Sequence, residues 1–106
     1  MRDFKWSDAE KKVARQAFNA GLKKEYAAVL DRLKGLAAKA ENPEEMWAIH
    51  DCLSEQRRMI DAKYDYRYSQ LIVVFGTLLR EKWIDDKVLE GLGEEKLQAI
   101  HRIAAF

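Results

Sequence analysis

The sequence predicts an all-α fold in which residues 1–106 form a single helical domain, with two long helices, two short C-terminal helices and a second copy that completes a homodimer. Three observations support the helical class. Apolar residues recur at steps of three and four along most of the chain, which is the spacing of one helix face. Only one proline and five glycines occur, which leaves few places for the reversals of a strand-turn-strand fold. Capping signals also stand before the apolar stripes.

The first helix is predicted from Ser7 to about Lys39. Ser7 and Glu10 have the spacing of a capping box, in which each side chain accepts a hydrogen bond from the other residue's backbone amide. The regular steps of the stripe that follows predict a helix without interruption. Its members are Phe18, Leu22, Tyr26, Val29, Leu33, Leu36 and Ala40.

The second helix is predicted from Pro43 to about Lys82. Asn42 is a favourable N-cap, and Pro43 fits the first helical position, where its missing amide donor is harmless. No proline follows and no glycine occurs before Gly76, so we expect a helix of roughly 60 Å at ~1.5 Å per residue. The β-branched run near Ile72 allows a bend there. The stripe consists of His50, Leu53, Arg57, Ile60, Tyr64, Arg67, Leu71, Val74 and Leu78.

Two short helices are predicted after Trp83, one capped by Asp85 and ending at Leu89, the other covering residues 94–103. They can shield only part of the long helices, whose stability depends on packing an apolar stripe. We therefore expect a homodimer, since a second copy is the simplest cover and two-fold dimers are the commonest oligomers. The near-heptad spacing suits an antiparallel or coiled-coil-like contact, although polar residues interrupt the stripe.

The composition argues against several functions. Nineteen basic and 18 acidic residues give a net charge of +1, so we expect no nucleic-acid partner. The longest apolar run, residues 71–75, is far shorter than the roughly 20 residues of a membrane helix, so we expect no membrane insertion. A single cysteine, Cys52, cannot form an internal disulfide, and the N-terminus has no apolar signal region. We expect a cytoplasmic protein.

The candidate site is a polar face of the second helix. An enzyme would need His50 to be oriented by a carboxylate, but adjacent Asp51 points ~100° away from it, and no activated nucleophile or phosphate-binding loop accompanies them. A metal site is not expected, because His50 and His101 are the only histidines and Cys52 stands alone. We therefore expect no enzymatic activity and no cofactor. The face consists of Trp47, His50, Asp51, Ser54, Arg57, Arg58 and Asp61.

Two interpretations of this face remain open. In the first, Trp47 anchors a protein partner and Arg57 binds a partner carboxylate, because both residue types are enriched at binding hot spots. In the second, the same residues form the dimer contact or a solvated face on which Arg57 pairs with Asp61. The spacing of the residues is the same in both cases.

The residues of this helix resemble the signature of the fluorescence recovery protein family. Trp6 and Ser7 also resemble the start of that family, so the resemblance covers nearly the whole chain. Its central motif is specific because it fixes many polar positions on one helix. The resemblance is carried by residues 47–54, Arg57, residues 60–67, Ser69, the apolar run to Phe75, and residues 78–81.

That resemblance implies an all-helical dimer with a regulatory activity. Members of the family are cyanobacterial proteins that bind the photoactivated orange carotenoid protein, mainly through its C-terminal domain. They accelerate the return of its red, quenching form to the orange, resting form and help it leave the phycobilisome. Phycobilisome fluorescence then recovers, and no covalent bond is made or broken. A cyanobacterial source would place the protein near the cytoplasmic face of the thylakoids.

By position, the resemblance implies which residues contact the partner or the second copy. Asp51 and Arg57 would form the charged pair, with Trp47 beside them. An apolar contact region would consist of Val73 and Phe75, near the end of the second predicted helix. The full set of candidates is Trp47, His50, Asp51, Arg57, Asp61, Val73, Phe75 and Lys96.

Three positions depart from the family pattern. Cys52 stands where an aromatic residue is familiar, Ala62 where glycine is usual, and Val73 where cyanobacterial members can have phenylalanine. Loss of an aromatic contact would weaken or alter partner binding. The alternative is therefore a relative from an organism without phycobilisomes, with the same fold and dimer but a different, unknown protein partner.

Overall fold

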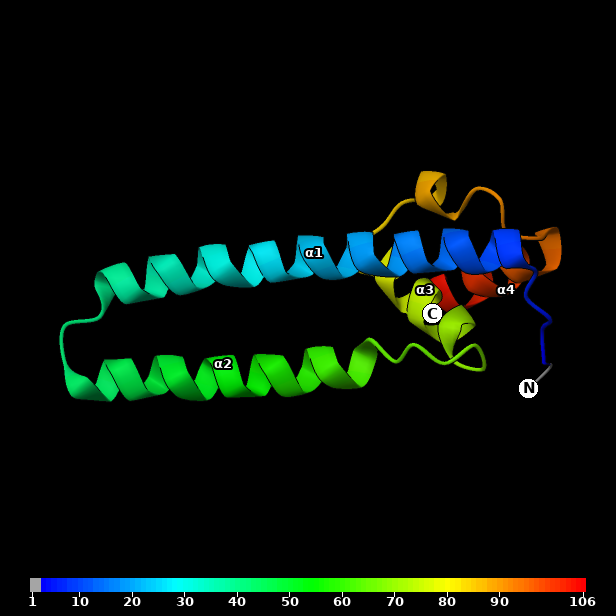
Figure 1. Ribbon diagram of the computed structural model, residues 1–106. Helices are drawn as coiled ribbons and strands as arrows, with labels where there is room; N and C mark the ends of the chain where they lie inside the picture. The colour runs from blue at the N-terminus through cyan, green and yellow to red at the C-terminus, as the bar shows by residue number, and fades with distance from the viewer. Residues whose placement is uncertain (1–2) are drawn as a thin grey trace.

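The computed structural model describes residues 3–106 and confirms the all-α class (Figure 1). No strand is present in that range, where one isolated bridge joins Glu90 and Leu92. The two predicted short C-terminal helices are both present. The elements are α1 (Asp8–Lys39), α2 (Pro43–Lys63), α3 (Leu71–Arg80), the 3₁₀ helix η1 (Asp86–Leu89) and α4 (Glu94–Ala104).

Two differently packed parts share α1. Its first half lies against α3, α4 and η1 at one end of the molecule, whereas its second half runs antiparallel to α2 with no third helix beside the pair (Figure 1). We call residues 26–63 the stalk and the other described residues the head. The radius of gyration is 16.6 Å and the long axis 53 Å, whereas a compact domain of this length has a radius of gyration of about 13 Å.

Local signals set the start of both stalk helices. At α1, the Glu10 amide donates to Ser7 Oγ (3.1 Å) and the Ser7 amide donates to Glu10 Oε1 (3.0 Å), so the predicted capping box is confirmed. At α2, the Asn42 side chain accepts a hydrogen bond of 2.8 Å from the Glu45 amide, and Pro43 is the first helical residue. These caps satisfy amide donors that the helices themselves cannot pair.

The prediction that the second helix continues to Lys82 is wrong. The helix ends at Lys63, and the non-helical residues 64–70 continue along α1 toward its N-terminal end before leading into α3. Tyr64 and Tyr66 pack edge-on against Phe18 of α1, with ring-centroid distances of 5.3 and 4.9 Å. Burying these rings against α1 outweighs the local helical periodicity, because tertiary contacts routinely override propensity.

The head contains the apolar core. A glycine allows α3 and α4 to cross closely within it, because a Cβ atom at Gly76 would lie 2.4 Å from the Cβ of Ile103. The glycine therefore sets how deeply α4 packs on α3. The largest fully buried side chains of the head are Leu71, Phe75, Leu78, Leu89 and Ile100.

We expect the substitution Gly76→Ala to lower the free energy of unfolding by about 2 kcal/mol, since an extra methyl group in a packed core forces side chains or backbone apart. The matched control is Gly35→Ala in the stalk, where a Cβ atom would meet no heavy atom within 4 Å. That change should be neutral or stabilising by up to about 1 kcal/mol, as expected for glycine replaced in a helix. Urea unfolding of both variants checks the contrast, and equal effects would contradict it.

Candidate protein-binding face on the stalk

The stalk leaves much apolar surface uncovered. Between residues 26 and 63, Ile60 is the only buried residue. A helical hairpin gains most of its stability by covering its apolar face, and exposed apolar surface of this extent is typical of protein interaction sites. The large apolar side chains that are exposed here are Tyr26, Leu30, Leu36, Met46, Trp47 and Met59.

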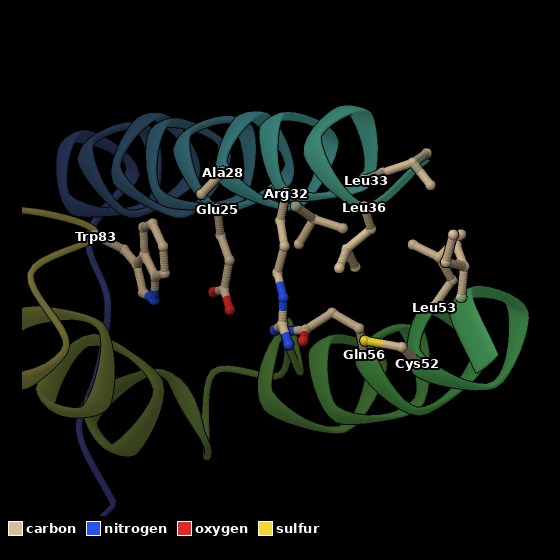
Figure 2. Close-up of a pocket in the computed structure, with 11 residues that line it drawn as sticks. Glu25, Ala28, Arg32, Leu33, Leu36, Cys52, Leu53, Gln56 and Trp83 are labelled. Atoms are coloured by element: carbon tan, nitrogen blue, oxygen red, sulfur yellow. The ribbon is translucent and has the colours of Figure 1, made fainter. Parts of the chain in front are cut away.

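A groove of about 170 Å³ runs between α1 and α2 (Figure 2). Leucines line its α1 wall, Arg32 extends across it toward Gln56 of α2, and Trp83 of the head stands at one end. The two helices thus meet without filling the space between them. The lining residues labelled in Figure 2 are Glu25, Ala28, Arg32, Leu33, Leu36, Cys52, Leu53, Gln56 and Trp83.

The predicted polar face of α2 points away from this groove. Trp47 is 59% exposed and packs edge-on against His50, with 5.9 Å between ring centroids. His50 Nδ1 lies 3.5 Å from Asp51 Oδ1, and about two turns further along α2 Arg57 Nε lies 3.8 Å from Asp61 Oδ2. All four polar side chains are mostly exposed. Exposed pairs at these distances contribute little to stability, so the face is available for binding.

The two adjacent arginines of this helix, Arg57 and Arg58, differ in how closely they are paired with a carboxylate. Arg58 donates to both carboxylate oxygens of Glu55, one at 3.1 Å, and this side-chain hydrogen bond lowers the pKa of Glu55 below its usual value. Arg57 has only the long contact with Asp61. Arg57 is therefore the more available of the two for bidentate binding of a partner carboxylate.

The candidates in the head lie in different environments. Val73 is half-buried on α3 and lines a hollow between α3 and the end of α2, together with Met59 and Ala62. Phe75 is fully buried in the core of the head. The expectation that Phe75 offers a contact surface therefore needs correction, since its ring has no exposed area with which to touch a partner.

Lys96 is also buried, and it belongs to the interior of the head. Its Nζ atom lies 3.0 Å from Glu10 Oε2 and 5.1 Å from the ring centroid of Trp6. Burial alone would raise the pKa of Glu10, but hydrogen bonds from the amides of Ser7 and Gly93 and from Lys96 lower it to about 2. The expected role of Lys96 in partner contact is thus replaced by an internal ion pair that ties α4 to α1.

One polar cluster was not predicted from the sequence. Glu25 of α1 is 3% exposed and accepts hydrogen bonds from Lys63 and Tyr64, at the end of α2. A signal for it exists, because Glu25 stands three residues after Leu22 and four before Val29, where an apolar residue would continue the stripe.

The described part of the chain was also searched for metal sites and membrane spans. Residues 3–106 contain no group of three or more histidine, cysteine, aspartate or glutamate side chains that could hold a metal ion. None of the described helices is long and apolar enough to cross a membrane.

Comparison with known proteins gives one consistent result. The family model described as photoprotection regulator fluorescence recovery protein matches residues 6–104. The fluorescence recovery protein of Synechocystis sp. PCC 6803 is 33% identical over 99 residues, which are 93% of this chain and 91% of that protein.

Solved structures agree with the sequence comparison. The fluorescence recovery protein of Fremyella diplosiphon superposes with a TM-score of 0.90 at 36% identity, over 96% of this chain and all of that chain. The structure of the Synechocystis sp. PCC 6803 protein gives a TM-score of 0.90 at 32% identity over the same shares of the two chains.

Acid is expected to weaken the fold through Glu10. Its pKa is about 2 in the folded protein against an ordinary 4.5, so its stabilisation is complete above the ordinary value and is lost as the pH falls below it. Between about pH 6 and pH 3, the wild type should lose on the order of 2 kcal/mol of unfolding free energy more than Glu10→Gln loses. Urea titrations across this range measure the difference. The exposed control Asp31→Asn should keep the wild-type pH dependence, and a Glu10→Gln curve parallel to the wild type would refute the assignment.

Proposed function

The chain belongs to the fluorescence recovery protein family, and we propose that it is a non-enzymatic cytoplasmic regulator that binds photoactivated orange carotenoid protein through the C-terminal domain of that partner. Binding accelerates the return of the red form to the orange form, and phycobilisome fluorescence is restored. The observation that carries the proposal is the outer face of α2, where Trp47, Asp51 and Arg57 are all mostly exposed. These three residues, called the α2 row below, are those that the resemblance implies for partner contact.

The chemistry of the row fits protein recognition. An exposed tryptophan supplies apolar area at low entropic cost, and an arginine without a close carboxylate partner supplies a fork of donors. Both stand on a regular 21-residue helix, which holds them at a fixed spacing. A rigid, prepared surface of this kind loses little conformational entropy when it binds.

Acceleration of a conformational change imposes a further requirement. The return to the orange form requires two separated domains of the partner to dock again. A protein that bound every state of the partner equally would shift nothing. The regulator must therefore bind the docking transition state more tightly than the open form, which lowers the barrier without any covalent step.

We further propose that the working assembly is a homodimer formed through the stalks. A second hairpin would cover exposed apolar residues of the stalk such as Leu30 and Leu36 and fill the groove between α1 and α2. The charges also suit such packing, because the stalk part of α1, residues 26–39, carries three basic residues and one acidic residue, whereas α2 carries five acidic and three basic ones. A stalk of one copy can thus place its basic helix against the acidic helix of the other.

A different protein partner is the second candidate. Val73 is half-buried at the position where cyanobacterial members can have phenylalanine, and Phe75 is buried, so α3 offers no aromatic contact at these two positions. A relative in an organism without phycobilisomes would keep the stalk and the dimer while binding another protein through the same row.

The first experiment follows the absorbance of photoactivated orange carotenoid protein in the dark, with and without this protein. Marked acceleration of the decay of the red form would support the recovery activity. An unchanged rate, with a folded protein confirmed by circular dichroism, would reject it and favour the second candidate.

The substitution Arg57→Leu should weaken binding of the photoactivated partner by about tenfold or more, because a hydrogen bond to a charged group contributes roughly 1.5–3 kcal/mol. Binding is measured by titration of the dark recovery rate, with the oligomeric state checked in parallel. The matched control Arg58→Leu removes an arginine already held by Glu55 and should retain activity. If Arg57→Leu keeps both activity and dimer, Arg57 does not belong to the site.

The substitution Leu36→Glu should convert the dimer into a monomer at micromolar concentration, because a charge would be buried without a partner in the filled groove. In a single copy this side chain is about one-third exposed, at 37%, so the variant should still fold. Sedimentation velocity measures the mass. The control Lys87→Glu introduces a carboxylate at an exposed position of the head, outside the stalk, and should remain dimeric. A dimeric Leu36→Glu protein would place the interface elsewhere.

A further inference from the structure

A buried carboxylate lies where the end of α2 meets the middle of α1. Glu25 Oε2 accepts a hydrogen bond of 2.7 Å from Lys63 Nζ, and Glu25 Oε1 accepts one of 2.8 Å from the Tyr64 hydroxyl. Lys63 Nζ also donates to Glu81 Oε1 at 2.6 Å, and the Trp83 indole donates to the same oxygen at 3.1 Å. The cluster therefore links α1, the end of α2 and the head.

The geometry of Glu25 fixes two successive residues at once. Each of its oxygens is used by one donor, so Lys63, the last residue of α2, and Tyr64, its C-cap, are both held against α1. Burial and the hydrogen bond to Glu25 raise the pKa of Tyr64, so its hydroxyl remains a donor. The end of α2 thus has one defined position on α1.

Stability alone does not explain this arrangement. Removing a carboxylate and an ammonium group from water is costly, and buried ion pairs are often no more stable than apolar residues of the same size. What directional hydrogen bonds can add is a unique geometry. In a single copy of the protein, the hydrogen bonds to Glu25 act where few other contacts fix α2, since Ile60 is the only buried residue of that helix.

We propose that Glu25 is a positioning residue for the partner-binding surface. By holding Lys63 and Tyr64 it sets the position of α2, which carries Trp47 and Arg57, relative to the head, which carries Val73. The stalk row and the head then meet one partner at a fixed spacing. This inference rests on the proposed function, because it assumes that both parts contact the same protein.

The position of α2 is measured by spin labels at Ser54 of α2 and Lys87 of η1, both exposed, in a Cys52→Ser background. Labelled chains are diluted with unlabelled chains, so that the distance within one chain is read. The test variant combines Glu25→Leu, Lys63→Met and Tyr64→Phe, which replaces the cluster by apolar side chains of similar size. We expect an unchanged unfolding midpoint and a clearly broader distance distribution than in the wild type.

The consequence for function is measured by titrating the unlabelled variant against photoactivated orange carotenoid protein. The maximal acceleration of recovery should fall about tenfold or more, since small misplacements of binding groups reduce rates strongly. The half-saturating concentration should change far less, because the row on α2 itself is intact. Tyr64→Phe alone, which keeps the ring on Phe18, should show the same changes to a smaller degree and serves if the triple variant does not fold.

Two results would overturn the inference: a distance distribution as narrow as that of the wild type, or a broadened distribution with full maximal acceleration. Glu10→Gln, which removes the partly buried carboxylate that pairs with Lys96, should leave the distance unchanged. If the wild type itself does not accelerate recovery, the proposed function fails and the functional part of this inference fails with it. The label distance still decides whether Glu25 fixes α2, because that measurement needs no partner.

Discussion

The head covers α1 only as far as Glu25, and most features of the molecule depend on that limit. A 32-residue helix is longer than the small head can bury, so its second half must be covered by something else. Among residues 3–106, α2 is the only helix beside this half of α1, and it leaves a groove and several exposed apolar side chains. The proposed dimer follows from this deficit, because a second stalk supplies the apolar surface that one chain lacks.

Carboxylates and cations serve different purposes in the two parts of the molecule. In the head, buried Lys96 pairs with the partly buried Glu10 and fixes α4 on α1. On the outer face of α2, Arg57 and Asp61 are exposed and only loosely paired. Since exposed pairs add little to folding stability, the polar residues on this outer face are not needed for the fold, and a binding role is the simpler account of them. Burial thus distinguishes structural charges from candidate recognition charges.

Much of the fold could be predicted from local signals, because these signals act over a few residues. The capping box at Ser7, the Asn42 cap with Pro43, and the Asp85 cap each mark a helix start that the structure shows. The end of α2 could not be predicted, since it depends on Phe18, which lies far away in sequence. A bend was predicted as possible near Ile72. The interruption lies earlier, at residues 64–70, and Ile72 is a regular part of α3.

In the candidate site too, the features set by helical spacing could be predicted, whereas those set by contacts between distant residues could not. Helical spacing alone placed Trp47, Arg57 and their neighbours on one face, because spacing and face are linked within a helix. The resemblance implied a contact at Phe75, and Lys96 was nominated with it, but both are buried. Their burial depends on how α3 and α4 pack in the head, which the sequence near either residue does not reveal. Glu25 was missed because its role depends on hydrogen-bond donors from residues 63 and 64. The fold brings these donors to Glu25, and no local sequence signal predicts that contact.

These observations connect rigidity with the proposed mechanism. A regulator that lowers a docking barrier must favour one arrangement of its partner's domains over others, and a flexible binder would follow every arrangement equally. The α2 row lies on the stalk and Val73 on the head. Their spacing can favour one arrangement of the partner's domains only if the junction between stalk and head is fixed. A buried, fully paired carboxylate at that junction supplies such a constraint at little gain in stability. The contrast between an exposed, adaptable binding row and a buried, directional junction is therefore what a conformational catalyst requires.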